Sequence, residues 1–158
     1  MKAYLEGQDS ELRNSSRQFA TFFVDGNLYG IDVMKVQEVT RPLEITRMRT
    51  APVFIKGLIN LRGQIATAIG ITELFGLTSA GEGSKMTVVC KVDDVLLSLL
   101  VDRIGDVVEV EEGRYEPAPV TIPANVRMFM TGIYKLDGKI LSIINLDFIL
   151  RELDKRCA

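Results

Sequence analysis

The chain has 158 residues, of which 47% are hydrophobic and none is histidine, and its formal net charge at pH 7 is −2. This length and apolar content suit one domain, or two small subdomains that share a core. The lack of histidine removes the commonest general base and the commonest metal ligand, and the small negative charge does not favour binding of the whole molecule to polyanions.

The termini and the cysteines favour a cytoplasmic protein. Residues 1–16 are polar and lack the apolar core of a signal peptide, so we expect a flexible tail there. Cys90 and Cys157 form no disulfide framework, which indicates a reducing compartment. The longest apolar stretches are interrupted by Asp102 and Asp147 and are too short to span a bilayer, so no direct membrane insertion is expected.

The first half of the chain predicts two hairpins joined by a connector. Asp25-Gly26 and Arg62-Gly63 are turn signals between runs of β-branched, aliphatic or aromatic residues. Pro42 and Pro52 bracket the connector, in which we expect a helical turn at 51–56. The strands expected in this half are 18–24, 28–33, 36–40, 58–61 and 64–71.

The second half repeats this order after a Gly- and Ser-rich linker at 79–84. Three prolines between 117 and 123 mark an irregular connector. Asn145 can cap a helix over 146–155, because the apolar residues of that segment share one helical face. The expected strands are 86–92 and 95–101 around a turn at 93–94, then 107–110, and finally 132–136 and 139–144 around a turn at 137–138.

The two halves are copies of one plan. Residues 54–65 return as 129–140, with phenylalanine, glycine and aliphatic positions repeated 75 residues later, and residues 24–33 return more weakly 68 residues later. The repeated residues specify a backbone, whereas Asn60-Leu-Arg62 and Lys135-Leu-Asp137 give the copies different surfaces. Many short strands in two copies predict a mainly β fold of two small barrels packed together.

No catalytic or cofactor site is expected. An aspartic protease dyad would need one loop from each copy at equivalent positions, but Asp25-Gly26 and Asp137-Gly138 lie at different places in the repeat and are better explained as turns. The glycines around Arg62 lack the Lys-Ser/Thr of a phosphate loop. No Cys-x-x-Cys metal motif occurs. We therefore expect a protein that is not an enzyme and uses no cofactor or metal.

Charge is distributed unevenly along the chain. Residues 41–62 contain five basic residues against Glu44 alone, and residues 93–116 contain eight acidic residues against two arginines. Opposite charges on the two halves suit docking to other proteins in a fixed orientation, although ordinary solvated surface also explains them. A small β-barrel protein that binds nucleic acid or a small ligand through the basic segment is the second hypothesis. The aromatic residues, however, lie in apolar runs typical of a core.

A run of residues also carries a family resemblance. Thr46-Arg47 and Ala51-Pro-Val-Phe-Ile-Lys-Gly-Leu-Ile-Asn-Leu-Arg-Gly63 resemble the most recognisable segment of the CheW family of bacterial chemotaxis, which includes the CheW adaptors and the regulatory domain of the histidine kinase CheA. The resemblance continues through Val101-Asp102, Pro117-Ala-Pro119 and Gly132 and covers about residues 18–150. Because no kinase or receiver region accompanies it, the chain is more similar to the adaptors.

The resemblance implies a fold and a role. The fold would be two five-stranded SH3-like barrels around a shared core, with one domain at 17–150 made of two intertwined subdomains and a C-terminal helix and tail at 145–158. The role would be that of a non-catalytic adaptor, monomeric on its own. It would couple the cytoplasmic tip of methyl-accepting chemotaxis receptors to the CheA regulatory domain, in arrays at the inner face of the membrane.

Site residues are implied by position in the family. The kinase-facing surface would include Val36, Gln37, Glu38, Thr40 and Arg41. The receptor would bind in a groove between the subdomains near Val33, Lys56, Gly57, Val88 and Ile104. The family hallmark is Asn60, Leu61, Arg62 and Gly63, in which Arg62 either contacts a partner or braces the fold.

Two departures from the family pattern are visible. After the hallmark the family continues with a proline and then an Asp-Leu-Arg run, whereas this chain has residues 64–72 without that possible ion pair and with Gly70, which weakens a strand. Residues 120–122 lack the aromatic side chain that helps to join neighbouring units in rings. We expect both changes to leave the fold intact and to alter the strength of kinase or ring contacts.

Overall fold

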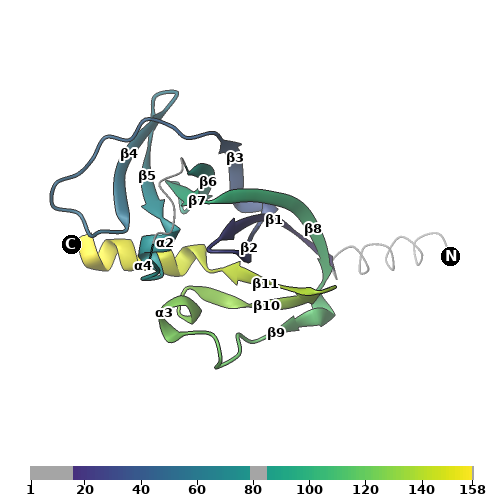
Figure 1. Cartoon of the computed structure of the whole chain (residues 1–158). Coiled ribbons are helices and arrows are strands. Elements are labelled where there is room, and N and C mark those ends of the chain that lie inside the picture. Colours follow the sequence, from purple (N-terminus) through teal and green to yellow (C-terminus); the bar gives the residue numbers. More distant parts are fainter. Residues whose placement is uncertain (1–15, 79–84, 158) are drawn as a thin grey trace, which may run out of the picture.

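The computed structural model of the chain describes residues 16–78 and 85–157. The tail expected at 1–16, apart from Ser16, and the linker expected at 79–84 lie outside the described residues. Ser16 already belongs to the first strand. Two sheets and several short helices make up the fold (Figure 1), which confirms the mainly β class and the two SH3-like barrels.

The two sheets contain all the long strands. In spatial order, the first sheet consists of β8 (Arg103–Glu111), β1 (Ser16–Val24), β2 (Asn27–Asp32), β11 (Lys139–Ile144), β10 (Met130–Leu136) and β9 (Tyr115–Glu116). The second consists of β3 (Val36–Thr40), β6 (Met86–Val92), β7 (Val95–Val101), β5 (Gln64–Gly70) and β4 (Ile55–Leu61). The helices are η1 (Val33–Lys35), α2 (Ile71–Leu74), η2 (Glu112–Arg114), α3 (Ala124–Arg127) and α4 (Leu146–Cys157), of which η1 and η2 are 3₁₀ turns.

Each sheet combines strands from both halves of the chain. The first hairpin of the first half, β1 and β2, pairs with β8 on one side and, in parallel, with β11 on the other. The first hairpin of the second half, β6 and β7, pairs in the same way with β3 and β5. The two copies have therefore exchanged their first hairpins, and neither half contains a complete sheet.

Local irregularities recur at the same positions of the two copies. The register of β4 against β5 shifts between Ile55 and Gly57, and that of β10 against β11 shifts between Met130 and Gly132, 75 residues later. The Gly70 N–H donates to the Phe54 carbonyl and the Asn145 N–H donates to the Phe129 carbonyl, both at 2.8 Å. The duplication seen in the sequence thus extends to bulges and backbone hydrogen bonds.

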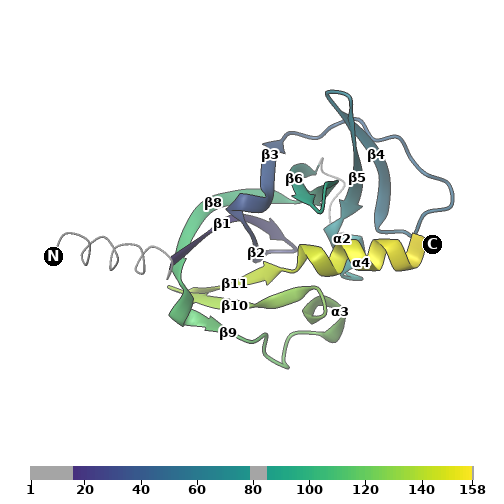
Figure 2. The ribbon, with the colours of Figure 1, turned by 180° about the vertical axis from the view of Figure 1, so that it is seen from behind.

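One large core lies between the sheets, and a smaller apolar cluster lies within each sheet. The large core takes side chains from strands of both halves and from α4, which continues the line of β11 between the two sheets in both views (Figures 1 and 2). The cluster of the first sheet includes Phe19, Tyr134 and Leu141, and that of the second consists of Ala66, Val89 and Leu96. Burial of this apolar surface supplies the main driving force for folding.

Several predicted elements differ from those observed: Val33, expected to end a strand, lies in η1, and β10 begins at Met130 instead of 132. The helical turn expected at 51–56 is wrong: the Ile55 N–H donates to the Pro52 carbonyl at 3.0 Å in a simple turn, and β4 begins at Ile55, because Ile55 already pairs with Ile69 of β5. β8 begins at Arg103 instead of 107, because its first residues pair with β1. The helix over 146–155 is confirmed and runs two residues further, to Cys157.

Candidate protein-binding surface

β3 is an exposed edge strand and carries most of the residues expected to face a kinase. It pairs only with β6 in the described part of the chain, and a register shift places Gln37 in a bulge. Gln37 is exposed, whereas Val36, Glu38 and Thr40 are half-buried, and Arg41 follows in the exposed loop. An edge strand leaves backbone donors and acceptors open on one side, and a bulge with charged neighbours limits non-specific pairing there.

An ion pair connects β3 to the opposite edge of the same sheet. Arg62, in the turn between β4 and β5, donates from Nη2 to the Glu38 carboxylate at 2.7 Å. β3 and β4 are the two edges of the second sheet, so this contact helps to close the sheet into a barrel. Arg62 remains 81% exposed and Glu38 only 28%, so the arginine makes this contact and stays accessible.

The other hallmark residues shape the turn that presents Arg62. The Asn60 Oδ1 accepts a hydrogen bond from the Gly63 N–H at 2.9 Å, which closes the turn. Leu61 packs against the small apolar cluster of the second sheet. Arg62 itself has a φ of 51°, in the left-handed region, so the hairpin tip holds its backbone in an uncommon conformation.

The five residues expected in a receptor groove fall into two groups. Val33 lies in η1, which contacts β1 and β6, and Ile104 on β8 pairs with β1, so these two half-buried residues lie near the junction of the sheets. Val88 is on β6 in the same region but is only 2% exposed. Lys56 and Gly57 lie instead on β4, at the far edge of the second sheet, and Gly57 is buried.

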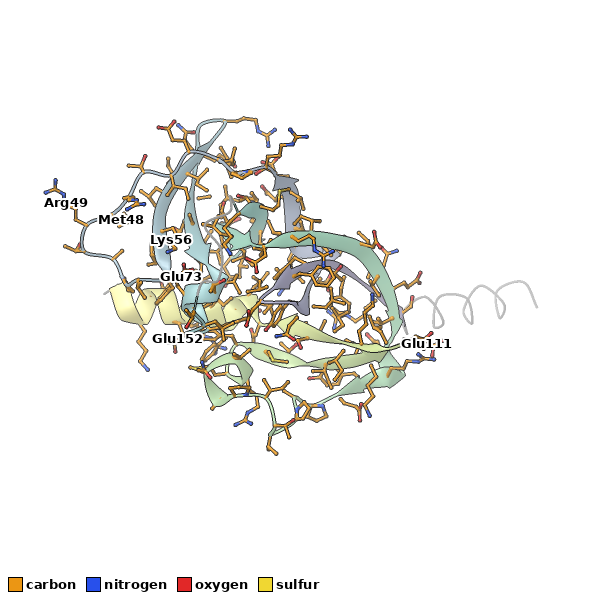
Figure 3. The ribbon with its side chains drawn as sticks, in the orientation of Figure 1. Met48, Arg49, Lys56, Glu73, Glu111 and Glu152 are labelled. Carbon is orange, nitrogen blue, oxygen red and sulfur yellow. The ribbon has the colours of Figure 1, made fainter. Side chains whose placement is uncertain are left out.

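An ion pair lies next to Gly70, where the chain departs from the family pattern. Lys56 Nζ lies 2.8 Å from Glu73 Oε1, and the two side chains lie side by side in Figure 3. A Cβ atom on Gly70 would come within 2.1 Å of Glu73 Oε2, so the glycine leaves room for this pair. Gly70 therefore ends β5 next to this ion pair. The strand continues to Gly70, so the glycine that departs from the family pattern does not disrupt the fold here.

The loop between β3 and β4 forms a basic, partly apolar projection. Arg41, Arg47 and Arg49 are exposed and have no ion-pair partner among the described residues. Met48 is 47% and Val53 is 74% exposed, and Figure 3 shows Met48 and Arg49 pointing away from the body of the protein. The sequence analysis identifies the charges but not the exposed apolar residues; the available signal is that Met48 lies between Pro42 and Pro52 and that Val53 directly follows Pro52.

On the acidic half, part of the charge holds the fold together. Burial raises the pKa of the Asp102 carboxyl, but hydrogen bonds from Lys85 and from the Asp25 N–H outweigh burial and hold that pKa below its usual value. Glu116 pairs with Lys135 at 3.1 Å. Glu109 on β8 is exposed, so the acidic surface is a mixture of structural and free carboxylates.

Three features of the described residues bear on metal binding, nucleophilic chemistry and membrane insertion. No group of three or more Cys, Asp or Glu side chains within residues 16–78 and 85–157 is placed to hold a metal ion. Burial raises the pKa of the Cys90 thiol to about 12, so it is a poor nucleophile. None of the helices in the described ranges is long and apolar enough to cross a membrane.

Known proteins resemble this arrangement over nearly the whole chain. The CheW-like domain family matches residues 18–154. The chain is 25% identical over 148 residues to the chemotaxis protein CheW of Rhizobium meliloti, which covers 93% of this chain and 96% of that protein. It is 28% identical over 145 residues to the chemotaxis protein CheW of Treponema pallidum, covering 87% and 85%. The solved structure of the scaffolding protein TtCheW from Thermoanaerobacter tengcongensis is similar with a TM-score of 0.75 and 31% identity, covering 82% of this chain and 88% of that one.

Proposed function

The chain belongs to the CheW-like domain family, and from this premise we propose that it is a non-catalytic adaptor of bacterial chemotaxis that couples membrane chemoreceptors to the histidine kinase CheA. The observation that carries this proposal is the family match over residues 18–154, together with the similarity in fold to a scaffolding protein. The adaptor would act in the cytoplasm, where it is recruited to receptor arrays at the inner face of the membrane.

In the proposed mechanism the adaptor binds the receptor and the kinase at the same time and catalyses no reaction. A rigid body that binds two partners raises the effective concentration of one at the other. A change in receptor packing then changes the contacts that the adaptor makes with the kinase, which is a coupling free energy between two sites. The exchange of hairpins supports this role, because it ties the two barrels into one body that can transmit a displacement.

The CheA regulatory domain is proposed to bind along β3. The accessible edge at Gln37, the half-buried Glu38 and the following Arg41 support this placement. The adjacent basic loop, with its unpaired arginines and exposed Met48, would extend the contact toward an acidic partner surface. The ion pair with Arg62 would hold Glu38 in place for that contact.

The receptor tip is proposed to bind beside η1, which contacts β6 and β1, and near the start of β8, which pairs with β1. Val33 and Ile104 supply partly accessible apolar surface at that junction. In this proposal Val88 supports the site from the core, Gly57 permits the tight approach of Thr46 to β4, and Lys56 acts through its pair with Glu73.

Co-elution tests the proposed function directly. The purified chain is mixed with a receptor signalling fragment and the CheA regulatory domain, and we expect one complex that contains all three on size exclusion. Absence of co-elution with both partners would contradict the adaptor role. Glu109→Lys, a reversal at an exposed carboxylate far along the sequence from β3, is the control and should leave the complex intact.

A charge-swap cycle tests whether Glu38 contacts the kinase or only stabilises the fold through its ion pair with Arg62. Glu38→Arg and Arg62→Glu each break the pair, and the double variant restores it with reversed polarity. We expect the double variant to recover thermal stability but not kinase binding, because the kinase would meet the wrong charge at position 38. Recovery of both would show that Glu38 acts only through the fold.

The unpaired arginines also favour a test of nucleic-acid binding as the alternative function. Retention on single-stranded DNA that falls steeply with salt, and is lost in an Arg47→Glu and Arg49→Glu double variant, would support the alternative. We expect no such retention at 150 mM salt, because the exposed apolar residues of the loop are aliphatic and offer no rings on which bases could stack.

A further inference from the structure

A hollow of about 390 Å³ lies at one end of the first sheet, and Lys35 of η1 is among its lining residues. It opens between the end of β2 and the end of β11, and the start of α4 forms one wall. Buried apolar side chains, including Phe19, Ile31 and Ile143, form its floor. Its volume is in the range of sites that bind small molecules or single side chains.

The hollow exists because the parallel pairing of β2 and β11 stops early. Those strands pair only as far as Gly30 and Ile143. In the second sheet the equivalent strands stay paired two residues further, to Leu100 and Gly70. Asp32 occupies the position equivalent to Leu100, so a charged residue stands where the other copy has an apolar one. The shared framework therefore does not require the hollow, and its lining is specific to this copy.

The rim carries more negative than positive charge. Arg17 pairs with Asp32 at 2.7 Å, and Lys35 pairs with Asp147 at 3.3 Å. Glu112 also lines the hollow and has no ion-pair partner among the described residues, so three carboxylates face two cations. Burial raises the pKa of Asp32, but hydrogen bonds from Arg17 and from the Met34 N–H outweigh it and hold that pKa below its usual value, so the carboxylate stays ionised at neutral pH.

Aromatic rings line the same hollow. The ring centroids of Phe19 and Tyr134 are 5.4 Å apart, and those of Tyr115 and Tyr134 are 5.6 Å apart. Tyr115 is 44% exposed and can offer a ring surface to a ligand. The Arg17 guanidinium already lies 5.3 Å from the centroid of the Phe19 ring, which shows that this environment accommodates a cation.

We propose that this hollow binds one organic cation, a guanidinium or alkylammonium group, between the exposed carboxylate of Glu112 and the ring of Tyr115. The excess negative charge attracts the cationic head, and the apolar floor receives its aliphatic stem. The inference does not rest on the adaptor function, because none of the residues named for the kinase or the receptor lines the hollow, although its wall shares η1 with the proposed receptor surface. The same chemistry is offered by an arginine or lysine side chain of another protein and by a free small cation.

Titration of the isotope-labelled full chain tests the proposal by NMR. The probes are N-acetyl-arginine amide and its uncharged isostere N-acetyl-citrulline amide. We expect saturable, millimolar shifts around η2, β9 and the end of β11 with the arginine probe only. Equal binding of both probes, or shifts that are not saturable or are spread over the surface, would overturn the proposal.

Matched variants locate the site. Glu112→Gln should weaken binding about threefold or more, whereas Glu109→Gln, at an exposed carboxylate outside the hollow, should have no effect. Tyr115→Phe keeps the ring and should bind as wild type, and Tyr115→Leu should bind roughly two- to fivefold more weakly. An equal effect of the two glutamate variants would overturn the proposal. So would wild-type affinity in both Glu112→Gln and Tyr115→Leu.

A final comparison separates the two sources of the cation. An acetylated, amidated Gly-Gly-Arg-Gly-Gly peptide should bind more tightly than N-acetyl-arginine amide if the hollow receives a side chain from another protein. A free diamine should bind more tightly than the peptide if the natural ligand is a small molecule. Binding of neither cation would overturn the proposal.

Discussion

Gly57 and Gly132 occupy equivalent positions of the two copies, but an added side chain would meet different neighbours at each. Both lie at the bulge of the last hairpin of their copy, 75 residues apart. A Cβ at Gly57 would come within 2.1 Å of the Thr46 carbonyl oxygen, and its φ of 142° is one that other residues rarely adopt. A Cβ at Gly132 would instead meet the ring of Tyr115 at 2.4 Å, and that side chain is partly exposed and can move.

We therefore predict that Gly57→Ala costs about 3 kcal/mol of unfolding free energy or more, because backbone strain adds to a clash with backbone atoms. Gly132→Ala should cost roughly 1 kcal/mol, since only a side chain must be displaced. Guanidinium chloride denaturation of both variants provides the measurement. Equal losses of unfolding free energy, or a larger loss for Gly132→Ala, would contradict this prediction. They would show that the backbone at Thr46 moves away from the new methyl group at little cost.

The lowered pKa of Asp32 should make the free energy of unfolding depend on pH. Its folded pKa lies below the usual value, so its contribution is fully present above the unfolded pKa of about 3.9 and is lost as the pH falls through the folded pKa. Asp32→Asn should lose roughly 1 kcal/mol at pH 7 and show a flatter stability profile below pH 4. Urea denaturation at a series of pH values tests this, with Glu109→Gln as the control. A wild-type slope in Asp32→Asn would contradict the role given to Arg17 and the Met34 N–H.

At the scale of the element, α4 illustrates a helix whose start is fixed locally and whose position is fixed by packing. The Phe148 N–H donates to the Asn145 Oδ1 at 3.0 Å, which confirms the cap expected from the sequence. Leu146, Ile149 and Leu153 then bury one face of the helix in the shared core. The equivalent α2 has four residues and Gly70 at its cap position, without a side-chain hydrogen bond.

Asn145→Ala should cost about 1 kcal/mol, because the first turn of α4 loses its side-chain acceptor. Asn145→Ser keeps an acceptor at that position and should cost only a few tenths of that amount. Thermal unfolding followed by circular dichroism distinguishes the two variants. Equal destabilisation of both variants would contradict the capping role, because Asn145→Ser keeps a side-chain acceptor and Asn145→Ala does not.

At the scale of the whole molecule, the exchange of hairpins decides how the protein can fold. Each sheet needs strands that are far apart in the sequence, and both parallel junctions, β2 with β11 and β5 with β7, are long-range pairings. The largest core likewise draws its members from both halves. Long-range pairing of this kind imposes a loop-closure cost before the contacts that offset it can form.

We predict that the fragments 1–78 and 85–158 are unfolded alone and recover native structure when mixed. Each fragment lacks the hairpin that completes its sheet, so it would expose unpaired strand edges and half of the shared core. Far-UV circular dichroism and size exclusion of each fragment and of the equimolar mixture test this. A cooperative unfolding transition in either isolated fragment would show that one half can form a barrel on its own.

Much of the fold was readable from the sequence because its signals are local. Turn residues such as Asp25-Gly26 and Asp137-Gly138 lie between apolar runs, and the observed strands β6, β7 and β11 match their predicted bounds. The Asn145 cap is another short-range signal. The sequence places the starts of β4 and β8 three and four residues late, because Ile55 pairs with Ile69 across its hairpin and Arg103 pairs with Phe23 of the distant β1, which extends both strands beyond what local propensity indicates.

The duplication, the mainly β class, the turns and the family can all be derived from the amino-acid sequence, because repeated glycines and apolar positions specify a backbone wherever they occur. Only the tertiary structure decided which hairpin completes which sheet, that Arg62 reaches across the barrel to Glu38, that Val88 and Gly57 are buried, and that β2 and β11 part to leave a charged hollow. Those outcomes depend on contacts between residues distant in the chain, whose energies appear in no local pattern.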